Sequence, residues 1–590
     1  MDVIVEIVHT RTGYPRDMLA PELDLEADLS IDSIKRVEII GALADRIGLP
    51  QDAGGSAESA IEELSRIKTL RGIVDWVSGH TAHPEPPAVE AEAAPASASA
   101  APPALGRLRV ELHALPPAPG DPEVLRGLRI GVVGEVGDGR GVVPAVTGAL
   151  RAHGADVTQL AEADAGFDAV LDLSALRPGT APVLPEVFPG LQRALTGGVH
   201  RLLLVTVRGE SAGAGMHGFA RSASLEYPGR LIRAVEVHSK EAPERIAAQL
   251  LAELSREPAE PADPAGATTP VAAPASVSYT ADGLRVTPQP VPAPLAPGDG
   301  TPPLDAGSVV LLTGGARGIT ARTALALARA TGCHVELMGR TPQPAAEADE
   351  FGHATDRVAL RAALIATGLR TPAEIEAAAS RILAEREVRA TLAALASVAA
   401  SVGYHCADVT DEQAVRGVVA TVRARHGRLD GIVHGAGTLN DGLLRDKQPA
   451  AFAEVFTTKV TGARHLAAAA AEHGAAPAPR FLALFGSVAG VYGNRGQTDY
   501  AAANDALDGL AHIWAEDFPG RVLSLDWGPW AAEAGGMVSP ELARAYSRRG
   551  IPLIDPEAGG AAFLAELAHG TDVQVVLMAA DGHEGSERRG

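Results

Sequence analysis

Three polar residues near position 500 have the types and spacing to polarise a carbonyl oxygen. The apolar run FLALF is followed by Gly486, which puts Ser487 at the end of a buried strand. Tyr500 comes thirteen residues later, at the start of a segment rich in helix formers, and Asn504 follows one helical turn further on the same face. The pattern predicts that a hydroxyl, a phenol and an amide meet at one edge of a sheet.

A glycine-rich turn earlier in the chain could bind a phosphate group. The segment SVVLLTGGARGITARTALALARATG, which begins at Ser308, has the pattern of a buried strand, a turn and a long helix. Gly314 and Gly315 permit a tight turn, and Gly318 allows the backbone to approach a ligand closely. The start of the helix then offers unpaired amides and a positive dipole end to a pyrophosphate. The turn is therefore a candidate dinucleotide site.

The end of the next strand, HVELMGR, indicates which dinucleotide is favoured. An acidic residue there would bind the ribose hydroxyls of NAD, whereas an arginine accommodates the 2′-phosphate of NADP. Arg340 ends this strand, and Arg317 in the glycine turn could help it. We therefore expect NADPH, the alternative being that Arg340 is an ordinary surface residue.

Composition limits the class of protein. A length of 590 residues suggests about four globular units, and the hydrophobic fraction of 46% can form sizeable cores. The net charge of −22 argues against nucleic acid or an anionic membrane as the main partner, and its simplest interpretation is solubility alone. Two cysteines cannot form a disulfide framework or a four-ligand zinc site, and no metal site is expected. Without a signal peptide or an apolar run of about 20 residues, the expectation is a cytoplasmic protein.

The order of helix-like and strand-like segments predicts a multidomain chain. We expect a small α-helical bundle followed by two α/β Rossmann-like subdomains, the second of which carries the glycine turn and the polar residues near position 500. The segments between them are rich in proline and alanine and resemble tethers. The predicted boundaries are 1–80 for the helical bundle, 81–105 for a linker, 106–300 for the first α/β subdomain and 301–590 for the second, with a helical insertion at about 343–400.

The helical bundle contains one candidate modification site. Ser33 follows Asp32 at the start of an amphipathic helix, where either residue could simply cap the helix. The longer run DLEADLSIDSIKRVEIIGALADRIGL, with RTGYPRDML before it and LRGIVDWV after it, resembles the acyl carrier domain of polyketide and polyunsaturated fatty acid synthases. The resemblance implies 4′-phosphopantetheine on Ser33, attached by a phosphopantetheinyl transferase. Ser30, where that family usually has glycine, is a departure of little weight.

The rest of the chain, from about residue 106 to 580, resembles the two-subdomain ketoreductase of type I polyketide or polyunsaturated fatty acid synthases, in the short-chain dehydrogenase/reductase superfamily. Its stretch GFARSASLEYPGRLIRAVEV is similar to the structural subdomain, which has lost its cofactor site, so Ser222 and Tyr227 are expected to pack or cap. A second, independent nucleotide-binding domain is the alternative there. Thr320 replaces the last glycine of the usual TGxxxGxG pattern, where its hydroxyl could reach the phosphate or its side chain could crowd the turn.

The resemblance also assigns roles to individual residues. The family's catalytic tetrad corresponds to Lys459, Ser487, Tyr500 and Asn504, and because residue 504 is asparagine the general YxxxK order is absent. Lys459 must therefore fold back to reach the tyrosine. Alone, each of these residues would suit a strand end, a loop or the surface. The residues expected to hold NADPH are Thr313, Gly314, Gly315, Arg317, Gly318, Ile319, Arg340, Asp408, Val409, Gly435, Ala436, Gly437 and Pro529.

These roles predict the reduction of a β-ketoacyl thioester to a β-hydroxyacyl thioester. Tyr500 is expected to donate a proton while Ser487 hydrogen-bonds the same oxygen, and a nearby Lys459 would lower the pKa of the phenol. Asn504 would order a water that relays protons to Lys459. In place of the LDD motif associated with the D-configured (3R) alcohol the chain has Leu439-Asn440-Asp441, which weakly favours that product. The segment from Ser524 to Met537 resembles the one that meets the nicotinamide at Pro529 and opens into a substrate lid. Its glycines permit hinge motion, and ordinary loop chemistry explains them equally well.

Other interpretations and partners stay open at this point. A carrier and scaffold module with an inactive reductase fold is one alternative, and a reductase of free small molecules is another. The resemblance implies that ketosynthase, acyltransferase and dehydratase domains act with this chain, in cis or in trans.

Overall fold

A computed structural model describes the main α/β region of the chain. Ser33 and most of the predicted carrier bundle lie outside the described residues, as do residues 81–104 of the predicted linker and the later part of the predicted lid, whereas Leu105 already belongs to a strand. The described residues are 16, 21–23, 67, 69–80, 105–117, 120–135, 139–177, 179, 181–256, 274–296, 301–345, 351–472, 474, 476–531 and 551–579.

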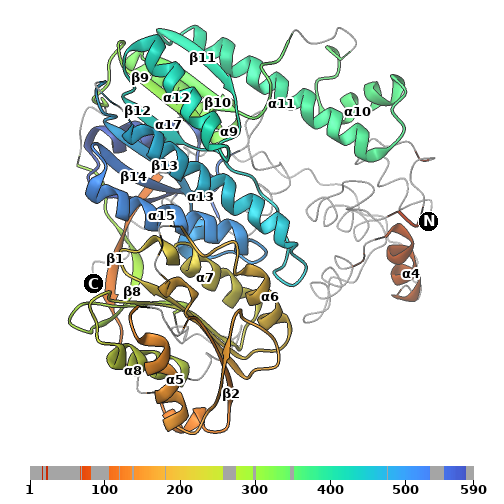
Figure 1. The fold of residues 1–590 in the computed structure, drawn as a ribbon. Coiled ribbons are helices and arrows are strands. Elements are labelled where there is room, and N and C mark those ends of the chain that lie inside the picture. The colour runs from red at the N-terminus through yellow and green to blue at the C-terminus, as the bar shows by residue number, and fades with distance from the viewer. Residues whose placement is uncertain are drawn as a thin grey trace, which may run out of the picture. The chain divides into compact units, whose positions relative to one another are not determined.

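A 15-stranded sheet runs through the larger of two compact units, which comprises residues 104–340, 394–529 and 554 onward (Figure 1). Seven parallel strands form its catalytic half, in the order β11-β10-β9-β12-β13-β14-β15. The elements of this half are β9 (Val309–Thr313), α9 (Gly318–Thr331), β10 (His334–Gly339), β11 (Ser401–Cys406), α12 (Glu412–His426), β12 (Gly431–His434), α13 (Pro449–Ala471), β13 (Phe481–Ser487), α14 (Val488–Tyr492), α15 (Thr498–Asp517), β14 (Arg521–Trp527), α17 (Pro556–His569) and β15 (Gln574–Ala579).

The structural half continues the same sheet. Its strands β7, β6, β5, β4, β2 and β3 are parallel, and β8 returns antiparallel to β7. The elements are β2 (Arg129–Val133), α5 (Val142–Ala152), β3 (Asp156–Leu160), β4 (Ala169–Asp172), α6 (Phe188–Thr196), β5 (Arg201–Val207), α7 (Met216–Glu226), β6 (Leu231–Val237), α8 (Pro243–Leu254), β7 (Ser276–Tyr279) and β8 (Arg285–Pro292).

One strand joins the two halves. β1 (Leu105–Ala114) lies between β15 and β8 and is antiparallel to both, with Leu105 opposite Ala579 and Leu108 opposite Pro292. Arg107 on β1 forms ion pairs with Glu566 and with Asp572, the latter at 2.7 Å. The predicted α/β fold is thus confirmed, but its two halves share a sheet.

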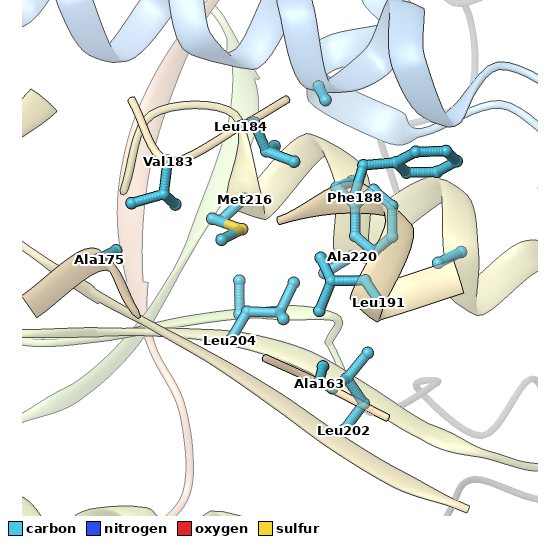
Figure 2. Packing of buried hydrophobic residues seen from close by; sticks show 14 of the residues in the cluster. Ala163, Ala175, Val183, Leu184, Phe188, Leu191, Leu202, Leu204, Met216 and Ala220 are labelled. Atoms are coloured by element: carbon cyan, nitrogen blue, oxygen red, sulfur yellow. The ribbon is translucent and has the colours of Figure 1, made fainter. Parts of the chain in front are cut away.

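The two halves also share a hydrophobic core. Phe188 of α6 stacks on Phe452 of α13 with ring centroids 4.1 Å apart, and the cluster extends to Ala502 of α15. Figure 2 shows Leu202 and Leu204 on the strand side of this cluster and Phe188 on the side facing the blue helix. Burial of aromatic side chains of this size dominates core energetics. Helices of the catalytic half therefore pack directly on the structural half.

The smaller unit contains the predicted helical insertion. Its helices are α10 (Arg357–Ala366) and α11 (Pro372–Ala396), with Leu360, Ile375 and Ala379 in one hydrophobic cluster. Asp356 caps α10 by accepting a hydrogen bond from the Ala359 amide at 2.8 Å. The unit also includes α4 (Leu70–His80). Among the described helices, none is long and apolar enough to cross a bilayer.

Candidate active site

The glycine turn follows β9 next to β12, where the order of the strands along the chain reverses, which is the ligand position expected in a sheet of this order. Gly314 has φ +70°, and a Cβ added there would lie 2.9 Å from Gly435 O. A Cβ on Gly315 would lie 2.8 Å from Leu337 Cδ2. Gly318 has φ +58° and begins α9. The glycines are therefore needed for a close-packed turn that leaves the amino end of α9 as an anion site.

Thr320 is buried beside a second glycine. Its side chain is 4% exposed, and a Cβ added to Gly435 would overlap its hydroxyl. The missing last glycine of the turn is therefore accommodated by a glycine in the neighbouring segment after β12. The sequence left two possibilities for Thr320, and the structure supports neither. Its side chain does not crowd the turn, because Gly435 leaves room for it, and its hydroxyl is buried rather than exposed to a phosphate.

The other residues predicted to hold NADPH follow the same sheet edge. Thr313 ends β9, Ile319 lies in the first turn of α9, Ala436 and Gly437 follow β12, and Pro529 follows β14. A Cβ on Gly437 would lie 3.2 Å from Lys459 Cε, which leaves little room between this segment and the site lysine. These residues predicted to hold NADPH thus lie together at the carboxyl ends of neighbouring strands.

Two arginines give the edge positive charge. Arg340 ends the β10 region with its side chain 56% exposed, 3.9 Å from Glu454, and Arg317 is exposed just before α9. Asp408 follows β11 and accepts hydrogen bonds from Thr410 N and Oγ1 at 2.9 and 2.8 Å. Burial would raise the pKa of Asp408, but these bonds and Arg340 lower it. The edge can therefore accept an anionic group beside Arg340 and Arg317.

Lys459 does fold back to the tyrosine. Its ammonium lies 5.4 Å from the centroid of the Tyr500 ring and donates a hydrogen bond to Phe485 O at 2.7 Å. Ser487 ends β13 and accepts a hydrogen bond from Ala489 N at 3.3 Å. The Asn504 amide donates to Tyr500 O at 2.7 Å, one turn back along α15. The four residues predicted from the sequence are thus brought together.

The protonation equilibria of this cluster are set by burial. Burial lowers the pKa of Lys459 to about 8, against the opposing charges of Asp526 and Asp508. Burial also raises the pKa of Tyr500, while hydrogen bonds to Ser487 and Asn504 act in the other direction. In the protein alone the pKa of Tyr500 is therefore raised and not lowered as expected, because desolvation is the larger effect.

Two buried ionisable residues beside the cluster were missed in the sequence. His434 lies between Thr313 Oγ1 and Lys459 O, at 2.8 Å from each, and burial lowers its pKa to about 3. The neutral ring must donate from Nε2, because the carbonyl can only accept. Asp526 lies inside the apolar strand VLSLDW, and burial raises its pKa to about 7. An acidic residue within such a strand was the available signal for Asp526, and His434 gave none.

The loop that carries Leu439-Asn440-Asp441 is tied to the start of α15. Lys447 donates to Asn440 O at 2.6 Å and forms a buried ion pair with Asp499 at 2.7 Å. Gln497 donates to both carboxylate oxygens of Asp441 at 3.0 Å. The loop is therefore fixed next to Tyr500.

Ser222 and Tyr227 have the packing roles expected for them. Ser222 is buried and accepts a hydrogen bond from Asn494 N at 3.0 Å. Tyr227 packs partly buried against the shared core, with Arg230 4.7 Å above its ring. Neither residue belongs to the candidate active site.

Residues 308–532 match the family model of the KR domain. A polyunsaturated fatty acid synthase protein from Thraustochytrium sp. is 31% identical over 296 residues, which are 48% of this chain and 10% of that protein. Erythronolide synthase EryA3 from Saccharopolyspora erythraea is 30% identical over 372 residues, 62% of this chain and 10% of that protein. The chain thus spans a tenth or less of the length of the curated relatives it matches.

Solved structures agree on the fold. The ketoreductase from the first module of phoslactomycin biosynthesis in Streptomyces sp. HK803 matches with a TM-score of 0.58 and 21% identity, over 81% of this chain and 94% of that one. The first ketoreductase of the tylosin polyketide synthase matches with a TM-score of 0.57 and 24% identity, over 80% and 92%. At these identities the similarity shows the α/β fold alone.

Proposed function

We propose that this chain reduces a β-ketoacyl thioester with NADPH to a β-hydroxyacyl thioester, because residues 308–532 match the family model of the KR domain. The observation that carries the proposal is the placement of the Lys459 ammonium 5.4 Å from the centroid of the Tyr500 ring, with Ser487 at the end of β13. These groups lie at the same sheet edge as the glycine turn.

The residues present suit NADPH. The turn at Gly314 has no room for a side chain, the amino end of α9 offers amides, and Arg317 and Arg340 supply positive charge where a 2′-phosphate would lie. Bound there, NADPH would supply the hydride. The nicotinamide end is expected near Pro529.

Residues of the chain would then stabilise the negative charge that develops on the keto oxygen. Tyr500 donates its proton to that oxygen, and the Ser487 hydroxyl hydrogen-bonds the same atom. Lys459 supplies a positive charge close to the phenolate that is left behind, which lowers the cost of its formation. Asn504 positions a water through which a proton can return.

The central experiment follows NADPH oxidation with a β-ketoacyl thioester of pantetheine as substrate. The wild-type chain should oxidise NADPH and yield the β-hydroxyacyl product by mass spectrometry. Tyr500→Phe should lower kcat by about 100-fold or more, because general acid catalysis typically contributes that much. Unchanged turnover in Tyr500→Phe would contradict the mechanism, and an absence of NADPH binding would favour a scaffold with an inactive fold.

The carrier function in cis is a second, separate part of the proposal. It rests on the resemblance around Ser33, which lies outside the described residues. Incubation with a phosphopantetheinyl transferase and coenzyme A should add one phosphopantetheine by mass, and Ser33→Ala should abolish the addition. A substrate loaded on Ser33 should be reduced more efficiently than the free thioester or a free ketone, because tethering raises its local concentration. Equal efficiency would support a reductase of free molecules.

The product and the partners are proposed at the family level. The retained Asp441 in Leu439-Asn440-Asp441 supports the D-configured (3R) alcohol. Ketosynthase, acyltransferase and dehydratase domains would supply the substrate and consume the product.

A further inference from the structure

The structural half packs on the helix that carries Tyr500 through α7. A Cβ added to Gly215 would lie 2.7 Å from Ala502 O, and one added to Gly218 would overlap Ala501 O. Both carbonyls belong to the turn of α15 that follows Tyr500. Figure 1 shows α7 next to α15 along the boundary between the two halves. The backbone that carries Tyr500 is therefore in direct contact with a helix of the structural half.

The last residue of α7 binds two active-site loops at once. Glu226 Oε2 accepts a hydrogen bond from Leu444 N at 2.6 Å, and Oε1 accepts one from Gly496 N at 3.1 Å. Leu444 lies in the loop between β12 and α13, which carries Leu439-Asn440-Asp441. Gly496 lies in the loop between α14 and α15, four residues before Tyr500. One carboxylate thus spans the two loops that border the candidate site.

The two loops are also joined to each other. Gly442 N donates to Gly496 O at 2.9 Å, next to the contact of Gln497 with Asp441. These bonds fix the loops relative to one another, but they lie entirely within the catalytic half. Glu226 is different because it holds both loops against the structural half.

A carboxylate suits this position better than a neutral side chain. Burial raises the pKa of the half-buried Glu226 above its usual value, although the amides of Leu444 and Gly496 and the charges of Lys447 and Arg495 act in the opposite direction. Hydrogen bonds to an ionised acceptor are shorter and stronger than neutral ones. Both amides point at acceptor-only oxygens, whereas a glutamine would present one oxygen and one NH₂ group, so one amide would lose its acceptor.

We propose that Glu226 is a positioning residue of the reductase, whose carboxylate sets the spacing of the two loops and thereby the face of the keto group that is reduced. This inference rests on the proposed β-ketoacyl reduction. A residue of the structural half then contributes to substrate binding and product configuration without touching the reacting atoms. A role in folding stability alone would change neither of these properties.

The experiment compares Glu226→Gln and Glu226→Ala with the wild-type full chain, using a β-ketoacyl pantetheine thioester and NADPH. Chiral chromatography gives the ratio of the two alcohol configurations, and initial rates give KM and kcat separately. Each variant should raise KM and lower the ratio of major to minor alcohol by about tenfold, as expected for a displaced loop at a site that selects one face. Glu226→Gln keeps the size of the side chain, so it tests the inference even where Glu226→Ala does not fold.

The matched control is Asp168→Asn. Asp168 is another carboxylate of the structural half that accepts a backbone hydrogen bond, from Arg129 N at 2.8 Å, but it precedes β4, which five strands separate from β15 in the sheet. It should leave KM and the alcohol ratio unchanged. Folded Glu226 variants with the wild-type ratio and KM would overturn the inference. A wild-type chain that does not oxidise NADPH would instead overturn the proposed function, so the two failures are distinguishable.

Discussion

Lys459 holds its positive charge where water does not solvate it. Its side chain is buried, its ammonium has a carbonyl partner in Phe485 O, and the nearby carboxyl groups belong to Asp526 and Asp508. Burial raises the pKa of Asp526 to about 7 and that of Asp508 well above its usual range. Around pH 8 Asp526 is therefore the ionised partner that favours the ammonium form of Lys459.

This charge arrangement predicts an alkaline limit to activity. The wild-type kcat/KM should fall as the pH rises through about 8, because Lys459 loses its proton while Tyr500, with its raised pKa, keeps its own. Asp526→Asn removes the negative charge that favours the ammonium, so the limit should move to lower pH, by on the order of one pH unit. Rates of NADPH oxidation across pH measure this shift.

A remote carboxylate provides the control for that shift. Asp517→Asn changes an exposed residue at the end of α15 and should leave the pH profile unchanged. An Asp526→Asn profile whose alkaline limit stays in place or moves to higher pH would contradict the electrostatic account.

At the scale of residues, site residues that belong to a motif could be predicted from the sequence. Residues whose role depends only on contacts with distant parts of the chain could not. Ser487, Tyr500 and Asn504 are close in the chain, and the expected fold brings Lys459 to them. Glu226 gave no signal, because its partners Leu444 and Gly496 are 218 and 270 residues away. The pKa of Tyr500 was predicted in the wrong direction since burial cannot be read from a motif.

At the scale of elements, two glycines determine how closely α7 approaches α15. Gly218→Ala should cost about 1–3 kcal/mol of folding free energy, because the new methyl group must displace Ala501 O. Since Ala501 follows Tyr500 directly, kcat/KM should also fall by about tenfold. Thermal unfolding and initial rates measure the two effects.

The control for this change is a helix glycine with free space around it. Gly148 lies in α5, and a Cβ there meets nothing within 4 Å. Gly148→Ala should be neutral or stabilise by up to about 1 kcal/mol, through helix propensity. If Gly218→Ala and Gly148→Ala changed the free energy of unfolding and kcat/KM equally, the close packing of α7 on α15 would be unimportant for stability and activity.

A buried carboxylate on β10 gives the catalytic half a distinct pH dependence. Burial alone would raise the pKa of Glu336, but hydrogen bonds from His405, His426 and Arg425 outweigh it and hold the pKa at about 2. A folded pKa below the unfolded value of about 4.3 contributes stability above that value, about 3 kcal/mol, which is lost as the pH falls from about 5 toward 2.

Glu336→Gln should therefore destabilise the protein most at neutral pH. The midpoint of urea unfolding should fall clearly at pH 7, and its difference from wild type should shrink as the pH is lowered to about 3. Glu412→Gln, at the exposed ion pair with Arg416, should change the free energy of unfolding by less than about 0.5 kcal/mol. A difference in urea midpoint between Glu336→Gln and wild type that grows at low pH would contradict the lowered pKa of Glu336.

At the scale of the whole molecule, β1 was the element that sequence reasoning missed. The alternation of segments predicted two α/β halves, and both are present. The placement of β1 between β15 and β8 depends on partners far away in the chain, and no local pattern records such pairing. The first half was consequently expected to be a separate subdomain, whereas it continues the sheet of the second.

The joining strand leads to a prediction about truncated chains. A chain beginning at residue 104 should fold and reduce a free β-ketoacyl thioester, whereas one beginning at residue 120 should aggregate. The shorter chain lacks β1, so two sheet edges are exposed and Glu566, 1% exposed, loses Arg107. Size-exclusion chromatography and NADPH oxidation measure the outcome. A soluble and active chain from residue 120 would show that the two halves are stable without their joining strand.

The position of β1 also has a consequence for synthesis on the ribosome. Leu105 emerges early, but its partner Ala579 is about 470 residues further along the chain. At a translation rate of about 5–20 residues per second, β15 is synthesised about 25–95 s after β1, and until then one side of β1 has no strand partner. Its other side can pair with β8 sooner. During translation the nascent chain therefore carries an open strand, and chaperones or neighbouring nascent segments have that interval in which to bind it.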